Sequence, residues 1–151
     1  MKRLLLFLLV LSYLLLPTSC HQRIPITVPE SAIEITVAPK GAESFTFQYT
    51  DSEKINAILD YFNNLVATGP ATDIDSLASF WSYNVTVTTL EGDTFSYEVG
   101  GSAYFMQQVG GAYDGTWYSI SYKQANEFSN LLQAMEPDVP SERSFFAENV
   151  A

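Results

Sequence analysis

The sequence contains little of what most catalytic and metal-binding sites are built from. Its 151 residues include one cysteine, Cys20, and one histidine, His21. A single cysteine excludes an intramolecular disulfide and any multi-cysteine metal site, and a single histidine excludes paired histidine ligands. Basic residues are also few, because seven Lys and Arg stand against 17 Asp and Glu, for a net charge of −10. Nucleic acids and anionic lipid headgroups are bound through Lys and Arg, so we expect neither as a partner.

Long hydrophobic runs are missing as well, although hydrophobic residues make up 47% of the chain. That content argues against wholesale disorder, and the length allows one domain. The longest uncharged apolar stretch is Leu4 to Leu16. A helix of that length spans about 20 Å at ~1.5 Å per residue, which is short of the ~30 Å hydrocarbon core of a bilayer. We therefore do not expect a permanent transmembrane helix.

Residues 1–19 have the composition of a signal peptide. Lys2 and Arg3 precede the apolar stretch, and small residues lead up to Cys20. A basic start, a short apolar run and small residues before a cleavage point are typical of secretion signals. The segment Pro17-Thr18-Ser19-Cys20 resembles the lipobox of bacterial lipoproteins, with Pro17 where a leucine is usual. The resemblance implies cleavage before Cys20, a diacylglyceryl thioether on its sulfur, and acylation of the new amino group.

That resemblance also implies a location in the cell envelope. Two or more acyl chains, at ~0.8 kcal/mol per buried CH₂, anchor a protein stably, here on the extracytoplasmic side of a membrane. Removal of Lys2 and Arg3 makes the mature chain still more acidic. This charge is expected to keep the domain soluble and away from anionic headgroups. The alternative is an ordinary signal peptide followed by a coincidental cysteine.

The mature chain divides into three parts. Residues 20–31 contain Pro25 and Pro29 and are predicted to form an extended tether. Residues 32–136 carry regular hydrophobic patterns and are predicted to form one α+β domain, followed by a flexible tail at 137–151. The run Thr50-Asp51-Ser52-Glu53, which is typical of a capped helix after a strand, is followed by a tyrosine-rich segment. On these features the domain loosely resembles small envelope lipoproteins, a resemblance that assigns no residue roles.

Alternation of apolar and polar residues predicts about six strands. The expected strands are 32–37, 44–49, 81–88, 94–99, 102–108 and 116–121. The first two form a hairpin and the last four an antiparallel meander, with a tight turn at Asp114-Gly115. Their polar residues are expected on one water-exposed face of the sheet. These are Glu34, Thr36, Ser44, Thr46, Gln48, Ser82, Asn84, Thr86, Thr88, Thr94, Ser96 and Glu98.

Two amphipathic helices complete the pattern β-β-α-β-β-β-β-α. The first is predicted after a capping box from Thr50 to Glu53, and Gly69-Pro70 is expected to end it. Its apolar stripe is Ile55, Ile58, Leu59, Phe62, Leu65 and Val66. The second is predicted after a capping box of Ser121 and Gln124. The expected fold is α+β, with both helices packed on one face of a mostly antiparallel sheet.

No residue pattern indicates catalysis, so we expect neither an enzyme nor a cofactor. Cys20 would be lipidated, and the lysines Lys40 and Lys54 are expected to be solvated, which leaves no activated nucleophile. The loop acids Asp73 and Asp75 lack the remaining ligands of a calcium-binding loop, so no metal site is predicted, and weak calcium binding stays open.

Aromatic residues give the best clue to function. Tyr104, Tyr113 and Trp117 do not fall clearly on the apolar faces of the predicted strands. Exposed Tyr and Trp side chains are typical anchors for protein partners and sugar rings. We therefore predict a non-catalytic binding module for a protein or glycan, with these three residues as the candidate contact. The alternatives are a structural or assembly accessory of the envelope and, least favoured, a small carboxylate-dependent hydrolase.

Overall fold

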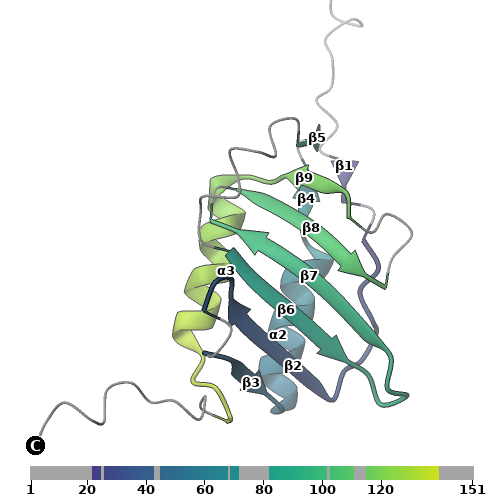
Figure 1. Ribbon diagram of the computed structural model, residues 1–151, viewed down its shortest axis with the longest axis vertical. Coiled ribbons are helices and arrows are strands. Elements are labelled where there is room, and N and C mark those ends of the chain that lie inside the picture. The colour runs from purple at the N-terminus through teal and green to yellow at the C-terminus, as the bar shows by residue number, and fades with distance from the viewer. Residues whose placement is uncertain are drawn as a thin grey trace, which may run out of the picture.

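The computed structural model describes residues 22–24, 26–42, 45–67, 69–71, 82–101, 103–110 and 115–139. These residues form an α+β fold with two helices and a mostly antiparallel open sheet, which confirms the predicted class (Figure 1). The main sheet has seven strands in the order β3-β2-β6-β7-β8-β9-β5, and β1 pairs with β4 separately. The strands are β1 Gln22–Arg23, β2 Glu34–Pro39, β3 Phe47–Tyr49, β4 Val66–Ala67, β5 Gly69–Pro70, β6 Ser82–Thr88, β7 Thr94–Gly100, β8 Tyr104–Val109 and β9 Trp117–Ser119; the helices are α2 Ser52–Asn63 and α3 Tyr122–Ala134.

Both helices are capped, although the cap of α2 differs from the prediction by one residue. Asp51, and not Thr50, is the N-cap, and its carboxylate accepts hydrogen bonds from the backbone N–H of Glu53 and Lys54. A carboxylate caps a helix at least as well as a threonine hydroxyl, and it also suits the positive end of the helix dipole. The capping box of Ser121 and Gln124 at the start of α3 is confirmed.

The end of α2 also differs from the prediction. The helix stops at Asn63, and Gly69–Pro70 form the edge strand β5, which pairs with β9. Proline has no N–H to give to a ladder, and an edge strand needs one set of bonds only. The two residues that the sequence predicts as a helix terminator therefore close one edge of the sheet.

The core lies between the sheet and the helices. Figure 1 looks onto the sheet from its other side, with α2 passing behind the strands. Phe62 of α2 is the centre of an aromatic cluster: its ring stacks on Tyr97 of β7 with centroids 4.4 Å apart, and lies 6.0 Å from Phe105 and 5.8 Å from Phe128. The predicted stripe of α2 is thus the surface that fixes the helix to the sheet.

Residues 22–24 and 26–28 pack on the domain, whereas the sequence predicts an extended tether at residues 20–31. Ile24 is 6% exposed and belongs to the core, and strand β1 pairs with β4. Thr27 is held from three directions: its N–H donates to Gln107 Oε1 at 2.9 Å, and its carbonyl accepts from Tyr97 Oη at 2.7 Å and Gln107 Nε2 at 3.2 Å. A wide seven-stranded sheet offers more apolar surface than these two helices cover, and the N-terminal segment packs on part of the remainder.

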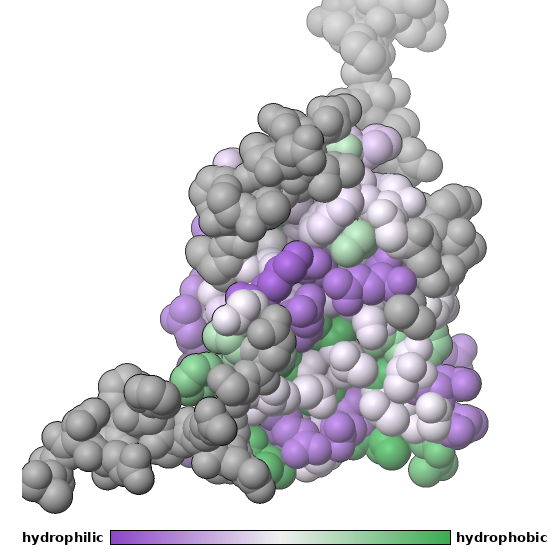
Figure 2. All heavy atoms as spheres, in the orientation of Figure 1, coloured by the Kyte–Doolittle hydropathy of each residue, from purple (hydrophilic) through white to green (hydrophobic). Residues whose placement is uncertain are grey.

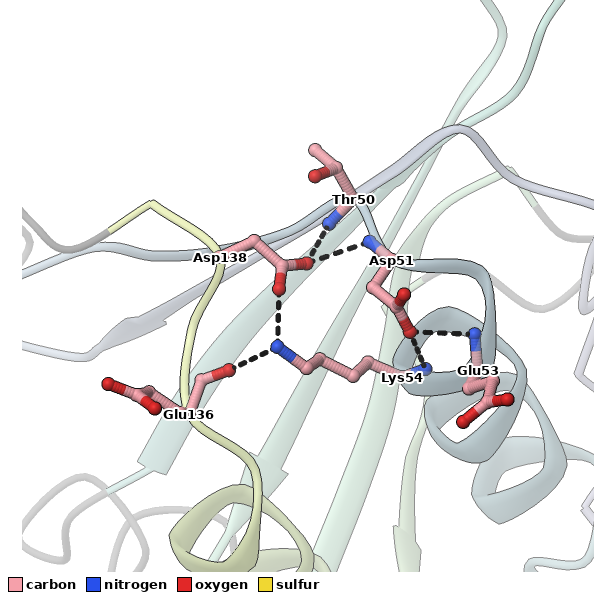
Figure 3. Close-up of polar contacts among 6 residues, drawn as sticks. All are labelled: Thr50, Asp51, Glu53, Lys54, Glu136 and Asp138. Carbon is pink, nitrogen blue, oxygen red and sulfur yellow. Dashed lines mark hydrogen bonds and ion pairs between the residues drawn. The ribbon is translucent and has the colours of Figure 1, made fainter.

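The predicted flexible tail likewise begins later than expected, because residues 138 and 139 are bound to the domain. The N–H groups of Asp138 and Val139 donate to the carbonyl of Gln48 on β3. The Asp138 carboxylate accepts from the N–H groups of Thr50 and Asp51, both at 2.7 Å, and pairs with Lys54 (Figure 3). These bonds lower the pKa of Asp138 from 3.8 to about 2, with Lys54 as the largest cause.

Several sequence predictions lie outside the described residues. They include the signal segment 1–19, Cys20, Tyr113, the acids Asp73 and Asp75, and the tail beyond residue 139. Within the described part of the chain, neither helix has the length and apolarity that crossing a membrane requires.

Candidate functional site

The candidate site lies on the outer face of the sheet, which we define as the face opposite α2 and α3. Strand register arranges its side chains in rows across the sheet. One row joins neighbouring strands through Ala38, Asn84, Glu98, Met106 and Trp117. The next row runs through Ser82, Gly100, Tyr104 and Ser119. In Figure 2, which views this face, hydrophilic residues gather across its middle.

Glu98 is the centre of a polar cluster on this face. Its Oε1 accepts hydrogen bonds from Lys40 Nζ and from Ser82 Oγ, each at 2.8 Å. Its Oε2 accepts from Gln108 Nε2 at 3.3 Å. Glu98 is only 4% exposed and Ser82 only 5%, so this carboxylate is buried, paired and hydrogen-bonded, as a buried charge must be. We call these four residues the Glu98 cluster.

Asn84 places an unsatisfied acceptor next to the Glu98 cluster. It is the direct cross-strand partner of Glu98, and its Oδ1 is buried with no hydrogen-bond partner among the described residues. A buried amide oxygen without a donor costs about 1–3 kcal/mol. The Asn84 amide is thus a polar group buried directly beside the Glu98 carboxylate.

Two of the three predicted contact residues lie together beside this cluster. Tyr104 and Trp117 both point to the outer face, because their neighbours Phe105 and Tyr118 are buried on the inner face. Tyr104 is opposite Ser119, and Trp117 is opposite Met106, so the two aromatics are diagonal neighbours on adjacent strands. Both are partly exposed. The third predicted residue, Tyr113, lies outside the described residues.

Both lysines reach solvent, as predicted, but each also forms an ion pair that the sequence did not predict. Lys40 lies in the turn after β2, and its ammonium pairs with buried Glu98 while the side chain stays 49% exposed. Lys54 pairs with Asp138 and also donates to the carbonyl of Glu136 at 2.7 Å (Figure 3). These two lysines thus hold distant segments together.

The arrangement suits recognition. Aromatic faces provide flat apolar contact, and adjacent hydrogen-bonding groups fix the orientation of what is bound. The alternation of polar residues correctly predicts that Glu98, Ser82 and Asn84 share the polar face. It does not predict that Glu98 and Ser82 are buried, or that Lys40 pairs with Glu98. Among the described residues, no three His, Cys, Asp or Glu side chains come together in a way that would hold a metal ion.

Comparisons with protein-family models, with curated proteins and with solved structures found no match to this chain.

Proposed function

We propose that the protein is a lipid-anchored, extracytoplasmic binding module that contacts a protein or glycan partner through the outer face of its sheet. The observation that supports this most directly is the neighbourhood of Tyr104 and Trp117 with the Glu98 cluster. Neither α2 nor α3 packs on that face. A partner would place an apolar or ring surface on the two aromatics and reach the exposed part of Lys40 at the Glu98 cluster.

The anchoring half of the proposal depends on Cys20. Metabolic labelling with a palmitate analogue is expected to label the wild-type protein in membranes. The Cys20→Ser variant is expected to lose the label, because serine has no sulfur to carry the diacylglyceryl thioether. Labelling of the serine variant would contradict lipidation at this residue.

The binding half is tested by crosslinking in native envelopes, followed by purification of the protein with its partners. The double variant Tyr104→Ala, Trp117→Ala is compared with wild type, and Tyr122→Ala is the matched control. Tyr122 is an aromatic residue that is 70% exposed at the start of α3, away from the outer face. We expect the double variant alone to lose one dominant crosslinked protein or glycan, with its circular dichroism unchanged.

Other outcomes separate the alternatives. A partner set that is the same in all three proteins would remove Tyr104 and Trp117 from the contact. Loss of a carbohydrate, and not of a polypeptide, would identify the partner as a glycan. An envelope phenotype of the gene deletion that the double variant fully complements would favour the structural accessory over the binding module.

A further inference from the structure

A groove of about 290 Å³ lies between α2 and α3, on the helix side of the sheet and thus apart from the outer face. It is lined by Ala57, Asp60, Tyr61, Asn64, Leu65, Gln124, Glu127 and Leu131. Tyr61 forms its aromatic wall and donates from Oη to the carbonyl of Gln124 at 3.2 Å, which links the two helices. The ring also lies 4.8 Å from the ring of Phe128. The walls are therefore fixed by core packing and by an interhelical hydrogen bond.

The charges of the groove are all of one sign. Asp60 on α2 and Glu127 on α3 contribute one carboxylate from each helix, and both residues are exposed. No described residue that lines the groove is basic. Glu127 has a contact with Lys123 at 3.6 Å, but Lys123 is 84% exposed, and such surface pairs are weak. Asp60 has no ion pair within the described part of the chain.

We propose that this groove binds a segment of a partner protein in which an arginine stands next to an aliphatic residue. The aliphatic side chain packs against Ala57 and Leu131, and the guanidinium pairs with the exposed carboxylates that line the groove, Asp60 and Glu127. Arginine fits better than lysine because its planar fork of N–H donors matches the two oxygens of a carboxylate. The net charge of −10 attracts such a basic partner from a distance. This inference goes beyond the proposed outer-face function and does not depend on it.

The test measures the fluorescence anisotropy of a labelled peptide of alternating leucine and arginine, with the full chain solubilised in a non-ionic detergent. The control peptide carries citrulline in place of arginine, which keeps the shape of the side chain and removes its charge. We expect the arginine peptide to bind about tenfold more tightly than the citrulline peptide, as two exposed ion pairs allow. Raising the salt concentration is expected to remove most of this difference.

Paired variants distinguish the groove from the general acidity of the protein. Asp60→Asn, Glu127→Gln removes both carboxylates of the groove. Glu91→Gln, Asp93→Asn removes the same charge from the exposed turn between β6 and β7. We expect about tenfold weaker binding of the arginine peptide in the first double variant and little change in the second. Binding of the citrulline peptide is expected to be equal in both.

Three results would overturn the proposal: equal binding of the two peptides, an equal loss of binding in the two double variants, or no binding of the arginine peptide below millimolar concentration. The variant Tyr104→Ala, Trp117→Ala is expected to bind the arginine peptide as the wild type does. If that variant loses arginine-peptide binding, the peptide occupies the outer face, and the groove is excluded. The experiment thus distinguishes failure of the groove proposal from failure of the proposed outer-face function.

Discussion

The docking of the N-terminal segment leads to a quantitative prediction for Gln107. This side chain is 1% exposed, and its amide bonds to both the N–H and the carbonyl of Thr27. In Gln107→Leu a similar volume remains, but the Thr27 N–H loses its acceptor, whereas the carbonyl keeps the hydrogen bond from Tyr97. The variant loses two partly buried hydrogen bonds, one to the Thr27 N–H and one to its carbonyl, each of which contributes about 1 kcal/mol. We expect the variant to lose about 2 kcal/mol of the free energy that holds this segment in place.

Trypsin provides the assay, because Arg23 lies inside the docked segment. Cleavage after Arg23 requires the segment to open, and a loss of about 2 kcal/mol raises the open population about 30-fold. The cleavage rate, followed by mass spectrometry, is expected to rise by about that factor under conditions in which the rest of the domain stays folded. Urea unfolding, monitored by tryptophan fluorescence, gives the accompanying loss of global stability.

A matched control and a second variant make this prediction falsifiable. Gln133→Leu changes an exposed glutamine of α3 and is expected to leave both measurements within about 0.5 kcal/mol of wild type. Tyr97→Phe removes one hydrogen bond to Thr27 and is expected to cost about 1 kcal/mol. If the Arg23 cleavage rate of Gln107→Leu equals that of Gln133→Leu, the glutamine does not hold the segment, and the interpretation is refuted.

Three further predictions concern other contacts. The pKa of Asp138 is lowered from 3.8 to about 2 in the folded protein, so its contribution to stability is present above pH ~4 and is lost as the pH falls toward ~2. The stability difference between wild type and Asp138→Asn in urea titrations is therefore expected to shrink across that range. A difference that stays constant would contradict this prediction. Gly110→Ala is expected to destabilise more than Gly92→Ala in thermal melts, because both have positive φ but only a Cβ at Gly110 meets Phe95, at 2.6 Å. Phe128→Ala, at a fully buried ring, is expected to cost about 3–5 kcal/mol of unfolding free energy, and a cost below ~1 kcal/mol would contradict the packing of α3.

Features with strong local patterns were predictable from the sequence. The stripe from Ile55 to Phe62 and the alternation in β6 and β7 fix which side chains face the core, and the structure confirms both. The docked segment was not predictable, since Thr27 and Gln107 are 80 residues apart and neither lies in a distinctive pattern. The same applies to the edge strand at Gly69–Pro70, whose two residues are typical of a turn.

The candidate site was predictable in part, for the same physical reason. The alternation in β8 and β9 places Tyr104 and Trp117 away from the core face, but only the pairing of these strands makes them neighbours. Glu98 was expected on a polar face, and periodicity carries no information about its bond to Lys40 from another strand end. The groove between α2 and α3 arises from the packing of two helices, which no local pattern specifies.

The position of β1 has a mechanical consequence for an anchored protein. Strand β1 begins at Gln22, so a lipid on Cys20 would be joined to the folded domain through a link of at most about 7 Å. The short link would then hold the acidic domain nearer to the membrane than its charge alone predicts. A pulling force on the domain would act first on the two-residue pairing of β1 with β4. Once this pairing and the Thr27 contacts break, residues 22–31 would extend and lengthen the link by about 30 Å. Single-molecule extension from Cys20 would show this as one early step that Gln107→Leu shifts to lower force. In a lipid-anchored protein the docked segment would therefore be a reserve of chain that lengthens the link to the membrane under load.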